Sequence, residues 1–478
     1  MKGSFFWHDY ETWGTDPRRD RPAQFAGIRT DEELNVIGDP LMIYCTPADD
    51  MLPHPEACLV TGITPQKALT EGVCEAEFMA SIHAELARPG TCGAGYNSIR
   101  FDDEFTRFGL YRNFFDPYAR EWQNGNSRWD IIDMVRLTHA LRPEGIEWPL
   151  NENGVVSFRL EDLTAANGIA HEGAHDALVD VHATIALARL IRERQPRLFD
   201  YIYRLRNKRL VEQQFDLRAK TPVLHVSGMF SADYGRIAMV APVARHPTNK
   251  NGIIVFDLRY DPTPFLDLSV EQLHERLFTP AAELPDGVER LPLKTVLLNK
   301  CPVVVPMNTL TPQAAERWKI DVAAGERHLQ LLQQVTAFEQ KVQQVHQLQQ
   351  YEPISDPDQA LYGGGFFSDD DRRQMDMVRE TPPQDLAELS LAFNDRRLPE
   401  MLFRYRARNW PETLSDEERV RWEGLRQARL LEPDGGGSII LSEFRQRVDA
   451  LQNDPALATE KRLVLEALVQ WVDGLLGD

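Results

Sequence analysis

The chain lacks the features that would place it in a membrane or in an oxidising compartment. Its 478 residues contain no uninterrupted run of about 18 apolar residues, which a membrane-spanning helix needs. Charged residues appear by His8 and Asp9, with no basic head and apolar core before them, so we expect no secretory signal. The five cysteines are scattered and form no Cys-x-x-Cys pair. This predicts a reduced, cytoplasmic protein without a zinc ribbon or a disulfide framework.

Positive charge is also scarce, since the formal net charge is −20, a balance that opposes binding to nucleic acid. The distribution is more informative than the sum. Between Asp200 and Tyr260, ten lysine and arginine residues stand against five acidic residues, which gives a local charge of +5. An acidic protein with one basic segment is compatible with a face that binds phosphate groups.

The sequence does contain a short apolar run, from Ser4 to Thr12, that ends in two acids. The run is long enough for a buried strand, and alternate strand residues face one side, so Asp9 and Glu11 point the same way. Two like charges this close repel unless a cation lies between them, and carboxylate oxygens suit Mg²⁺ or Mn²⁺. Alone, the pair is equally compatible with a strand that ends in a polar turn.

The first 195 residues alternate strands and helices in the manner of an α/β domain. After the first strand, we expect strands at residues 24–29, 36–44 and 91–97, of which the first two extend an antiparallel meander. We expect helices at residues 75–87, 129–141, 158–167 and 176–192, and another that starts around Phe101, with a loop at 60–65. Two further carboxylates join the acidic pair here. Asp102 opens the helix that starts around Phe101, and Asp180 lies one turn into the last helix.

Two changes of pattern divide the remaining chain. A basic helix over 198–211 leads into β-rich runs that Pro, Gly and Asn separate, which predicts a small barrel or sheet with insertions. A Gln-rich segment at 331–345 repeats apolar residues at helical spacing, and we expect one helix that packs on its own domain. From Ser368, which we expect to cap a helix that opens with three acids, the chain is predicted to be mostly helical.

Four carboxylates and one histidine form the candidate active site. Four such carboxylates can hold two Mg²⁺ ions about 4 Å apart, the arrangement used for in-line displacement at a phosphodiester. One ion would lower the pKa of the attacking water and the other would stabilise the leaving oxygen. His175, just before the helix of Asp180, is suited to take the proton of that water. The carboxylates are Asp9, Glu11, Asp102 and Asp180.

The order and spacing of these residues resemble the DnaQ-like 3′→5′ exonucleases, in the branch with a histidine five residues before the last aspartate. The resemblance is carried by DYET at 9–12, YNSIRFDD at 96–103 and HDALVD at 175–180, with VTGIT at 60–64 in support. Over nearly the whole chain the sequence is similar to the bacterial exodeoxyribonuclease I family. Stretches that support this wider similarity are HDYETWGTDPRRDRPAQFAGIRTD, NSRWDIID and GFFSDDDR.

The resemblance implies three domains: a ribonuclease H-like exonuclease domain with a mixed sheet, a Src-homology-3-like β-barrel domain with flanking helices, and an all-helical C-terminal domain. Their expected bounds are 1–195, 196–350 and 351–478. It implies processive, Mg²⁺-dependent release of 5′-mononucleotides from single-stranded DNA in repair and recombination, with Mn²⁺ able to substitute. It also implies docking on the acidic C-terminal tail of single-strand DNA-binding protein, and we expect a monomer.

Carried over residue by residue, the resemblance assigns roles to the candidate site. His175 would be the general base, with Glu11 and Asp102 taking part in catalysis. Glu11 and Arg159, at the start of a predicted helix, would contact the terminal nucleotide. The metal ligands would be Asp9, Glu11, Asp102 and Asp180.

A surface that binds single-stranded nucleic acid without sequence preference needs basic groups along the phosphates and aromatic rings that stack on the bases. A Gly-rich loop at 363–365 precedes two phenylalanines, and we expect a mobile loop that exposes this aromatic pair. Each aromatic alone is more often part of a core. The candidate basic residues are Arg107, Arg136, Lys208, Lys250 and Lys300, and the candidate stacking residues are Tyr118, Trp122, Phe366 and Phe367.

Two other functions remain open at this point. A single-stranded nucleic-acid-binding or scaffold protein could keep a nuclease fold without activity, although such proteins typically lose a carboxylate and all four are present. The segment from His171 to His175 also matches the HExxH motif of zinc peptidases, in which both histidines lie on one helix face. Gly168 and Gly173 disfavour a helix there, and Glu193 would be the third zinc ligand.

Overall fold

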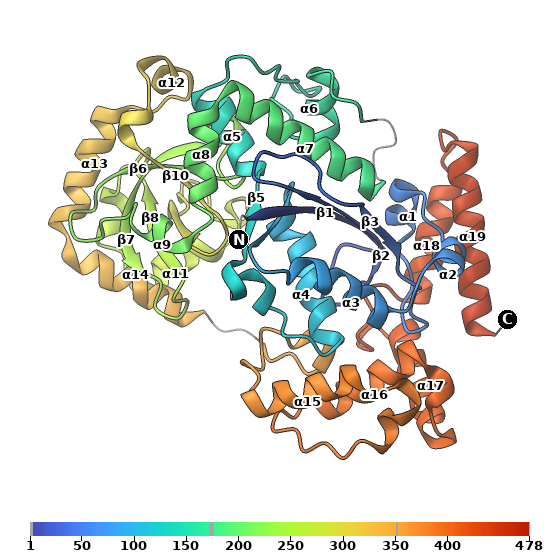
Figure 1. Ribbon diagram of the computed structural model, residues 1–478. Coiled ribbons are helices and arrows are strands. Elements are labelled where there is room, and N and C mark those ends of the chain that lie inside the picture. The colour runs from blue at the N-terminus through green and yellow to red at the C-terminus, as the bar shows by residue number, and fades with distance from the viewer. Residues whose placement is uncertain (1–2, 172–175, 350–351, 478) are drawn as a thin grey trace. The chain divides into compact units, whose positions relative to one another are not determined.

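The structure is a computed structural model that describes residues 3–171, 176–349 and 352–477 (Figure 1). Contacts divide the chain into two compact units. Unit 1 comprises Met1–Ser127, His171–Ile185 and Pro353–Asp478, and unit 2 comprises Arg128–Ala170 and Ala186–Glu352. Among the described residues, no helix combines the length and the apolar character needed to cross a bilayer.

The core of unit 1 is a mixed sheet built on β1 (Ser4–Thr12). β2 (Pro22–Thr30) pairs antiparallel with β1, and β3 (Leu41–Tyr44) pairs antiparallel with β2, which confirms the predicted meander. β4 (Thr91–Gly95) lies parallel to β1 on its other side, so the order within the unit is β3-β2-β1-β4. The third strand starts at Leu41, later than predicted, because Gly38-Asp39-Pro40 interrupts the segment: the glycine has a left-handed backbone and the proline lacks an amide hydrogen.

The apolar part of β1 is buried on both faces of the sheet. Phe5 and Trp7 lie on one face with ring centroids 5.3 Å apart, and the Trp7 indole donates a hydrogen bond to Thr30 Oγ1 at 3.0 Å. Phe6 and Tyr10 enter the core on the other face, where both pack against Phe25. Alternation along the strand therefore puts Asp9 and Glu11 on the face of Phe5 and Trp7.

The helices from the N-terminal half of unit 1 follow the predicted order, with two unpredicted helices before Glu75. The expected loop at 60–65 is helical up to Thr61, and Gly62 then ends the helix with a left-handed backbone, φ 70°. α4 starts at Asp102 as predicted and buries Phe105 and Phe108. The bounds are α1 (Pro55–Thr61), α2 (Pro65–Glu71), α3 (Glu75–Leu86), α4 (Asp102–Arg112) and α7 (Ala177–Arg194), of which α7 belongs to unit 1 as far as Ile185.

The C-terminal segment of unit 1 is mostly helical, as predicted. Ser368 caps α15, because its hydroxyl accepts a hydrogen bond from the amide of Asp371. The helices are α15 (Asp369–Glu380), α16 (Leu398–Asn409), α17 (Asp416–Leu431), α18 (Leu441–Gln452) and α19 (Thr459–Leu476).

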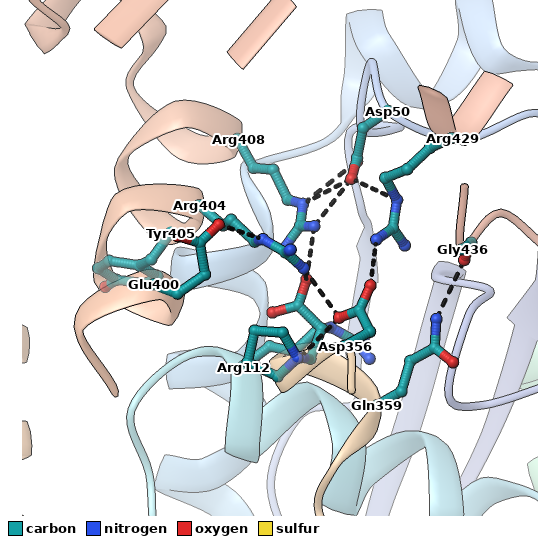
Figure 2. A network of polar contacts seen from close by, with 12 residues as sticks. Asp50, Arg112, Asp356, Gln359, Glu400, Arg404, Tyr405, Arg408, Arg429 and Gly436 are labelled. Atoms are coloured by element: carbon teal, nitrogen blue, oxygen red, sulfur yellow. Dashed lines mark hydrogen bonds and ion pairs between the residues drawn. The ribbon is translucent and has the colours of Figure 1, made fainter. Parts of the chain in front are cut away.

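A buried ion-pair cluster ties these helices to the N-terminal part of the same unit (Figure 2). Arg408 of α16 lies 2.8 Å from Asp50 and 2.7 Å from Asp358, and Arg429 of α17 lies 3.1 Å from Asp50. Burial alone would raise the pKa of Asp50, but the two guanidinium groups hold it below its ordinary value. Removing Asp50 would take one partner from each of two buried guanidinium groups and destabilise the fold, so the two parts of unit 1 stabilise each other.

The predicted β-rich runs of unit 2 form one five-stranded antiparallel sheet, in the order β10-β6-β7-β8-β9. Its strands are β6 (Val223–Val226), β7 (Ile237–Arg245), β8 (Gly252–Asp257), β9 (Leu293–Leu297) and β10 (Val303–Pro306). β5 (Ser127–Asp130) starts at the last residue of unit 1. The helices are α5 (Ile132–Leu141), α6 (Leu160–Ala166), α8 (Pro196–Arg204), α9 (Lys208–Glu212), α10 (Thr263–Leu266), α11 (Val270–Phe278), α12 (Pro312–Arg317), α13 (Val322–Gln334) and α14 (Thr336–Leu348).

Three predicted helices of this region are interrupted or shortened by local hydrogen bonds and backbone geometry. Trp129 lies in β5, and the side chain of Asp130 accepts from the amide of Ile132, where α5 starts. The basic helix over 198–211 is two helices, because the side chain of Asn207 caps α9. The Gln-rich helix also splits in two at Val335, whose ψ of 79° is not helical.

Candidate active site

Three of the four predicted acids meet at the end of β1. One carboxylate oxygen from each of Asp9, Glu11 and Asp180 lies within 4.8 Å of the others, close enough for all three to share one divalent cation. Glu11 is buried, whereas Asp9 and Asp180 are partly exposed. The site therefore combines a fixed carboxylate with two that solvent or a ligand can reach.

The fourth acid, Asp102, is hydrogen-bonded to the backbone of Tyr10, which lies between Asp9 and Glu11 in β1. Its Oδ1 accepts a hydrogen bond of 3.0 Å from the amide of Tyr10. Asp102 is the first residue of α4 and is buried, with its charge close enough to raise the pKa of both Asp9 and Glu11. The four acids thus come from three separate segments, β1, α4 and α7.

A second acid, Asp176, directly precedes α7, and a histidine, His171, contacts Asp180 in its first turn. The side chain of Asp176 accepts hydrogen bonds from the amides of Leu178 at 3.0 Å and Val179 at 3.4 Å, which caps the helix. Asp180 follows one turn later, and its Oδ1 lies 2.5 Å from Nε2 of His171. The cap fixes the orientation of the first turn, and with it the position of the Asp180 carboxylate.

The acids of the site raise one another's pKa. Burial is the main cause for Asp9, and the charges of Asp102, Glu11 and Asp180 add to it. Burial, followed by the charges of Asp180, Asp102 and Asp176, raises the pKa of Glu11 to about 9. Hard carboxylate oxygens that repel one another in this way fit a divalent cation, which would remove the repulsion.

Replacing Glu11 with glutamine is expected to stabilise the metal-free protein at neutral pH. Folding raises the pKa of Glu11 from 4.5 to about 9, so the folded protein favours the protonated carboxyl group. The stability that this group contributes is complete below pH 4.5 and is lost as the pH rises toward about 9. Glutamine mimics the protonated acid at every pH. We expect a gain of about 1–3 kcal/mol in the free energy of unfolding at pH 7.5, measured by urea unfolding in EDTA.

The matched control is Glu77→Gln, on the exposed side of α3, which should change the free energy of unfolding by less than about 0.5 kcal/mol. Adding Mg²⁺ should stabilise the unaltered chain more than the Glu11 variant. Equal stability of the two in EDTA would contradict a repulsive cluster of acids.

The remaining predicted site residues lie elsewhere or are differently placed. His175 lies outside the described residues. Arg159 is an exposed residue of unit 2 at the start of α6, where it pairs with Glu161. Arg107 differs from expectation: it is buried and paired with Glu104 and Glu121, so its charge is already neutralised. Of the other basic candidates, Arg136 pairs with Asp133, Lys208 and Lys250 are exposed, and Lys300 is partly buried.

The predicted stacking residues divide into exposed and buried rings. Trp122 is 65% exposed and Phe366 is 80% exposed, and Tyr118 contacts the Phe366 ring edge-on at 5.7 Å. Phe367 corrects the expectation of an exposed pair, because it is buried and stacks on Tyr111 at 5.8 Å. The Gly-rich loop before it is also tied: Arg397 donates hydrogen bonds to the carbonyls of Ala360 and Gly365.

Reasoning from the sequence missed two polar residues near the acids and one exposed aromatic. Tyr362 is 50% exposed, and its hydroxyl accepts a hydrogen bond from Arg107 at 3.1 Å. Gln24, opposite Glu11 in the sheet, gave no signal beyond its place in a strand. His171 was noticed only as part of the HExxH motif. It precedes α7, and the other residues of that motif, 172–175, lie outside the described residues.

Comparison with known proteins identifies relatives for every part of the chain. Residues 6–188 match the family described as Exonuclease, residues 206–348 match the Exonuclease I SH3-like domain, and residues 355–475 match the Exonuclease I C-terminal domain. Over 477 residues the chain is 47% identical to exodeoxyribonuclease I of Escherichia coli strain K12. The aligned region covers 100% of this chain and 99% of that protein.

Solved structures of relatives also resemble the whole chain. A moderately thermophilic Exonuclease I from Methylocaldum szegediense is 55% identical, with a TM-score of 0.96 over 99% of this chain and 100% of that one. The zinc-bound complex of Escherichia coli ExoI with single-stranded DNA is 47% identical, with a TM-score of 0.94 over 100% of both chains. Both likenesses extend across the acidic site and the two units.

Proposed function

This chain belongs to the exonuclease I family, and we propose that its four acids act through two Mg²⁺ ions. The protein is a 3′→5′ exonuclease of single-stranded DNA that depends on a divalent metal. Its fold combines a ribonuclease H-like exonuclease domain, a Src-homology-3-like domain and a helical C-terminal domain. The alternative of a catalytically silent binding or scaffold protein is therefore wrong.

The observation that carries the proposal is the convergence of Asp9, Glu11 and Asp180 within 4.8 Å, with Asp102 fixed beside them by the Tyr10 amide. These acids would hold the metal. When bound, two Mg²⁺ ions lower the pKa of the attacking water and stabilise the leaving oxygen. Glu11 and Asp102 are the buried members of the set, with Asp102 held by the Tyr10 amide, and Asp180 is set by the cap of α7.

We propose His175 as the general base that takes the proton of the attacking water. Support comes from its place five residues before Asp180 and from the ordinary pKa of histidine, about 6.5, which leaves a neutral ring available near pH 7. Arg159 and Glu11 are proposed to contact the terminal nucleotide. For Arg159 the support is an exposed guanidinium at a helix start in unit 2.

The strand path is proposed to use exposed or partly exposed rings and exposed lysines. Trp122, Phe366 and Tyr118 would stack on bases, at about 1–3 kcal/mol per base, and Lys208 and Lys250 would contact phosphates. Tyr362 joins the aromatic candidates because it is exposed and contacts Phe108 edge-on at 5.7 Å. Phe367 and Arg107 are withdrawn from this set because both are buried.

Three further proposals follow from the resemblance of the sequence. The chain would act as a monomer and would bind the acidic C-terminal tail of single-strand DNA-binding protein, for which a synthetic tail peptide is the direct probe. The proposed domains, 1–195, 196–350 and 351–478, are supported by the matched ranges, each of which falls inside one of them.

The test of the proposed function uses end-labelled oligonucleotides with Mg²⁺ or EDTA. A 5′-labelled single strand should shorten from its 3′ end, whereas a 3′-labelled strand should release a labelled mononucleotide at once. A blunt duplex should resist, and EDTA should stop the reaction until Mg²⁺ is restored in excess. A circular single strand is the matched control, because it offers no end. Cleavage of the circle, or undiminished activity in EDTA, would contradict the proposal.

A further inference from the structure

A buried glutamine lies beside the acidic site without belonging to it. Gln24 of β2 stands directly opposite Glu11 of β1 and directly opposite Tyr44 of β3. Opposite residues of antiparallel strands project their side chains to the same face, so these three side chains form a row across the sheet. Gln24 is 1% exposed, and an amide buried this deeply needs partners for both its oxygen and its nitrogen.

The partners of Gln24 connect the sheet to the helix that carries Asp180. Its Oε1 accepts a hydrogen bond of 3.3 Å from the amide of Ala177, the first residue of α7. Its Nε2 donates a hydrogen bond of 3.1 Å to the hydroxyl of Tyr44. The amide is therefore oriented from both ends, with its oxygen turned toward the helix.

The start of α7 depends on this contact. The first amides of a helix have no partner within the helix and must find one outside it. The side chain of Asp176 satisfies those of Leu178 and Val179, and Gln24 satisfies that of Ala177. Of these two side chains, only that of Gln24 comes from the sheet. It sits next to Glu11, whereas Asp180 lies one turn further along the helix.

We propose that Gln24 is a positioning residue that sets the distance between Asp180 and the acids of β1, and so tunes metal affinity. This inference rests on the proposed function, because it needs Asp9, Glu11 and Asp180 to be metal ligands. Gln24 would not contact the metal or the DNA. Groups that orient metal ligands typically change metal affinity by about 10- to 100-fold when removed.

Replacing Gln24 with leucine tests the proposal, since leucine fills a similar volume without either hydrogen bond. The Mg²⁺ concentration at half-maximal activity should rise by about 10- to 100-fold, while kcat at saturating Mg²⁺ stays within about threefold of the unaltered chain. Mn²⁺ binding without DNA, measured by calorimetry, should weaken by a similar factor. A merely structural role would instead lower the active fraction at every Mg²⁺ concentration and leave the half-maximal value unchanged.

Two more variants make each outcome decisive. Gln66→Leu is the matched control, because Gln66 donates its hydrogen bond to the carbonyl of Ala467 and not to the site, and its metal requirement should not change. Tyr44→Phe removes the hydroxyl that accepts from Gln24, leaves the 3.6 Å contact of Gln24 with Met42 Sδ in place, and should shift the Mg²⁺ requirement severalfold in the same direction. If Gln24→Leu does not fold, Tyr44→Phe decides, and an unchanged requirement overturns the inference.

The same measurements separate this inference from the proposed function. If Mn²⁺ binds the Asp9→Asn variant as tightly as the unaltered chain, the metal assignment itself fails. If Mn²⁺ binding depends on Asp9 but is equally tight in Gln24→Leu, only the positioning role of Gln24 is overturned.

Discussion

Replacing Asp9 with asparagine is expected to lower kcat on single-stranded DNA by about 10³-fold or more, a loss of at least about 4 kcal/mol of transition-state stabilisation. Asparagine keeps the size of the side chain but removes one of the charges that would hold the metal. Asp9 lies on the strand at the centre of the site, where its pKa is raised by burial and by three neighbouring acids. Single-turnover kinetics on a 5′-labelled oligonucleotide would measure the loss.

Strand binding should survive this change. The exposed rings and lysines proposed for the strand path lie outside the acidic cluster, so the affinity for an oligonucleotide in Ca²⁺ or EDTA should stay within about threefold. Asp200→Asn, an exposed carboxylate of α8, is the control and should leave both activity and binding unchanged. Retained activity in Asp9→Asn, with Mn²⁺ binding intact, would refute the metal assignment.

The parts of the site that could be predicted from the sequence are those that local periodicity controls. Alternation along an apolar strand is enough to place Asp9 and Glu11 on one side, and the structure has them there. The helix start at Asp102 follows from the change from small residues to a run with buried phenylalanines. The convergence of these segments with α7 depends on contacts between residues far apart in the sequence. The spacing of the motifs indicates it only through the resemblance to a family.

Where the sequence reasoning was wrong, tertiary partners decided the outcome. Phe366 and Phe367 are chemically identical neighbours, yet one is 80% exposed and the other stacks on Tyr111. Arg107 looks like a free cation until Glu121, fourteen residues later, is found 2.7 Å away. The contact of Gln24 could not be predicted for the same reason. Its side chain accepts a hydrogen bond from the amide of Ala177, which lies 153 positions away in the sequence. None of these pairings leaves a periodic signal.

Replacing His175 with glutamine is expected to lower kcat by about 10²- to 10⁴-fold, the usual contribution of a general base. A neutral imidazole with the ordinary histidine pKa of about 6.5 accepts the proton of water near neutral pH, and glutamine cannot. The activity of the unaltered chain should therefore fall as the pH drops below about 6.5, and the variant should lose this acidic limb. A pH series of kcat at saturating Mg²⁺ would measure both effects.

His171→Gln is the matched control, since it changes the other histidine of the same segment. His171 contacts Asp180 Oδ1, a proposed ligand atom, so its loss should alter the Mg²⁺ requirement and leave the acidic limb in place. The two histidines would then be distinguished by kind of effect as well as by size. A modest loss in His175→Gln with an unchanged pH profile would remove His175 from the role of base. If the limb disappeared in His171→Gln instead, the base would be the histidine that touches Asp180.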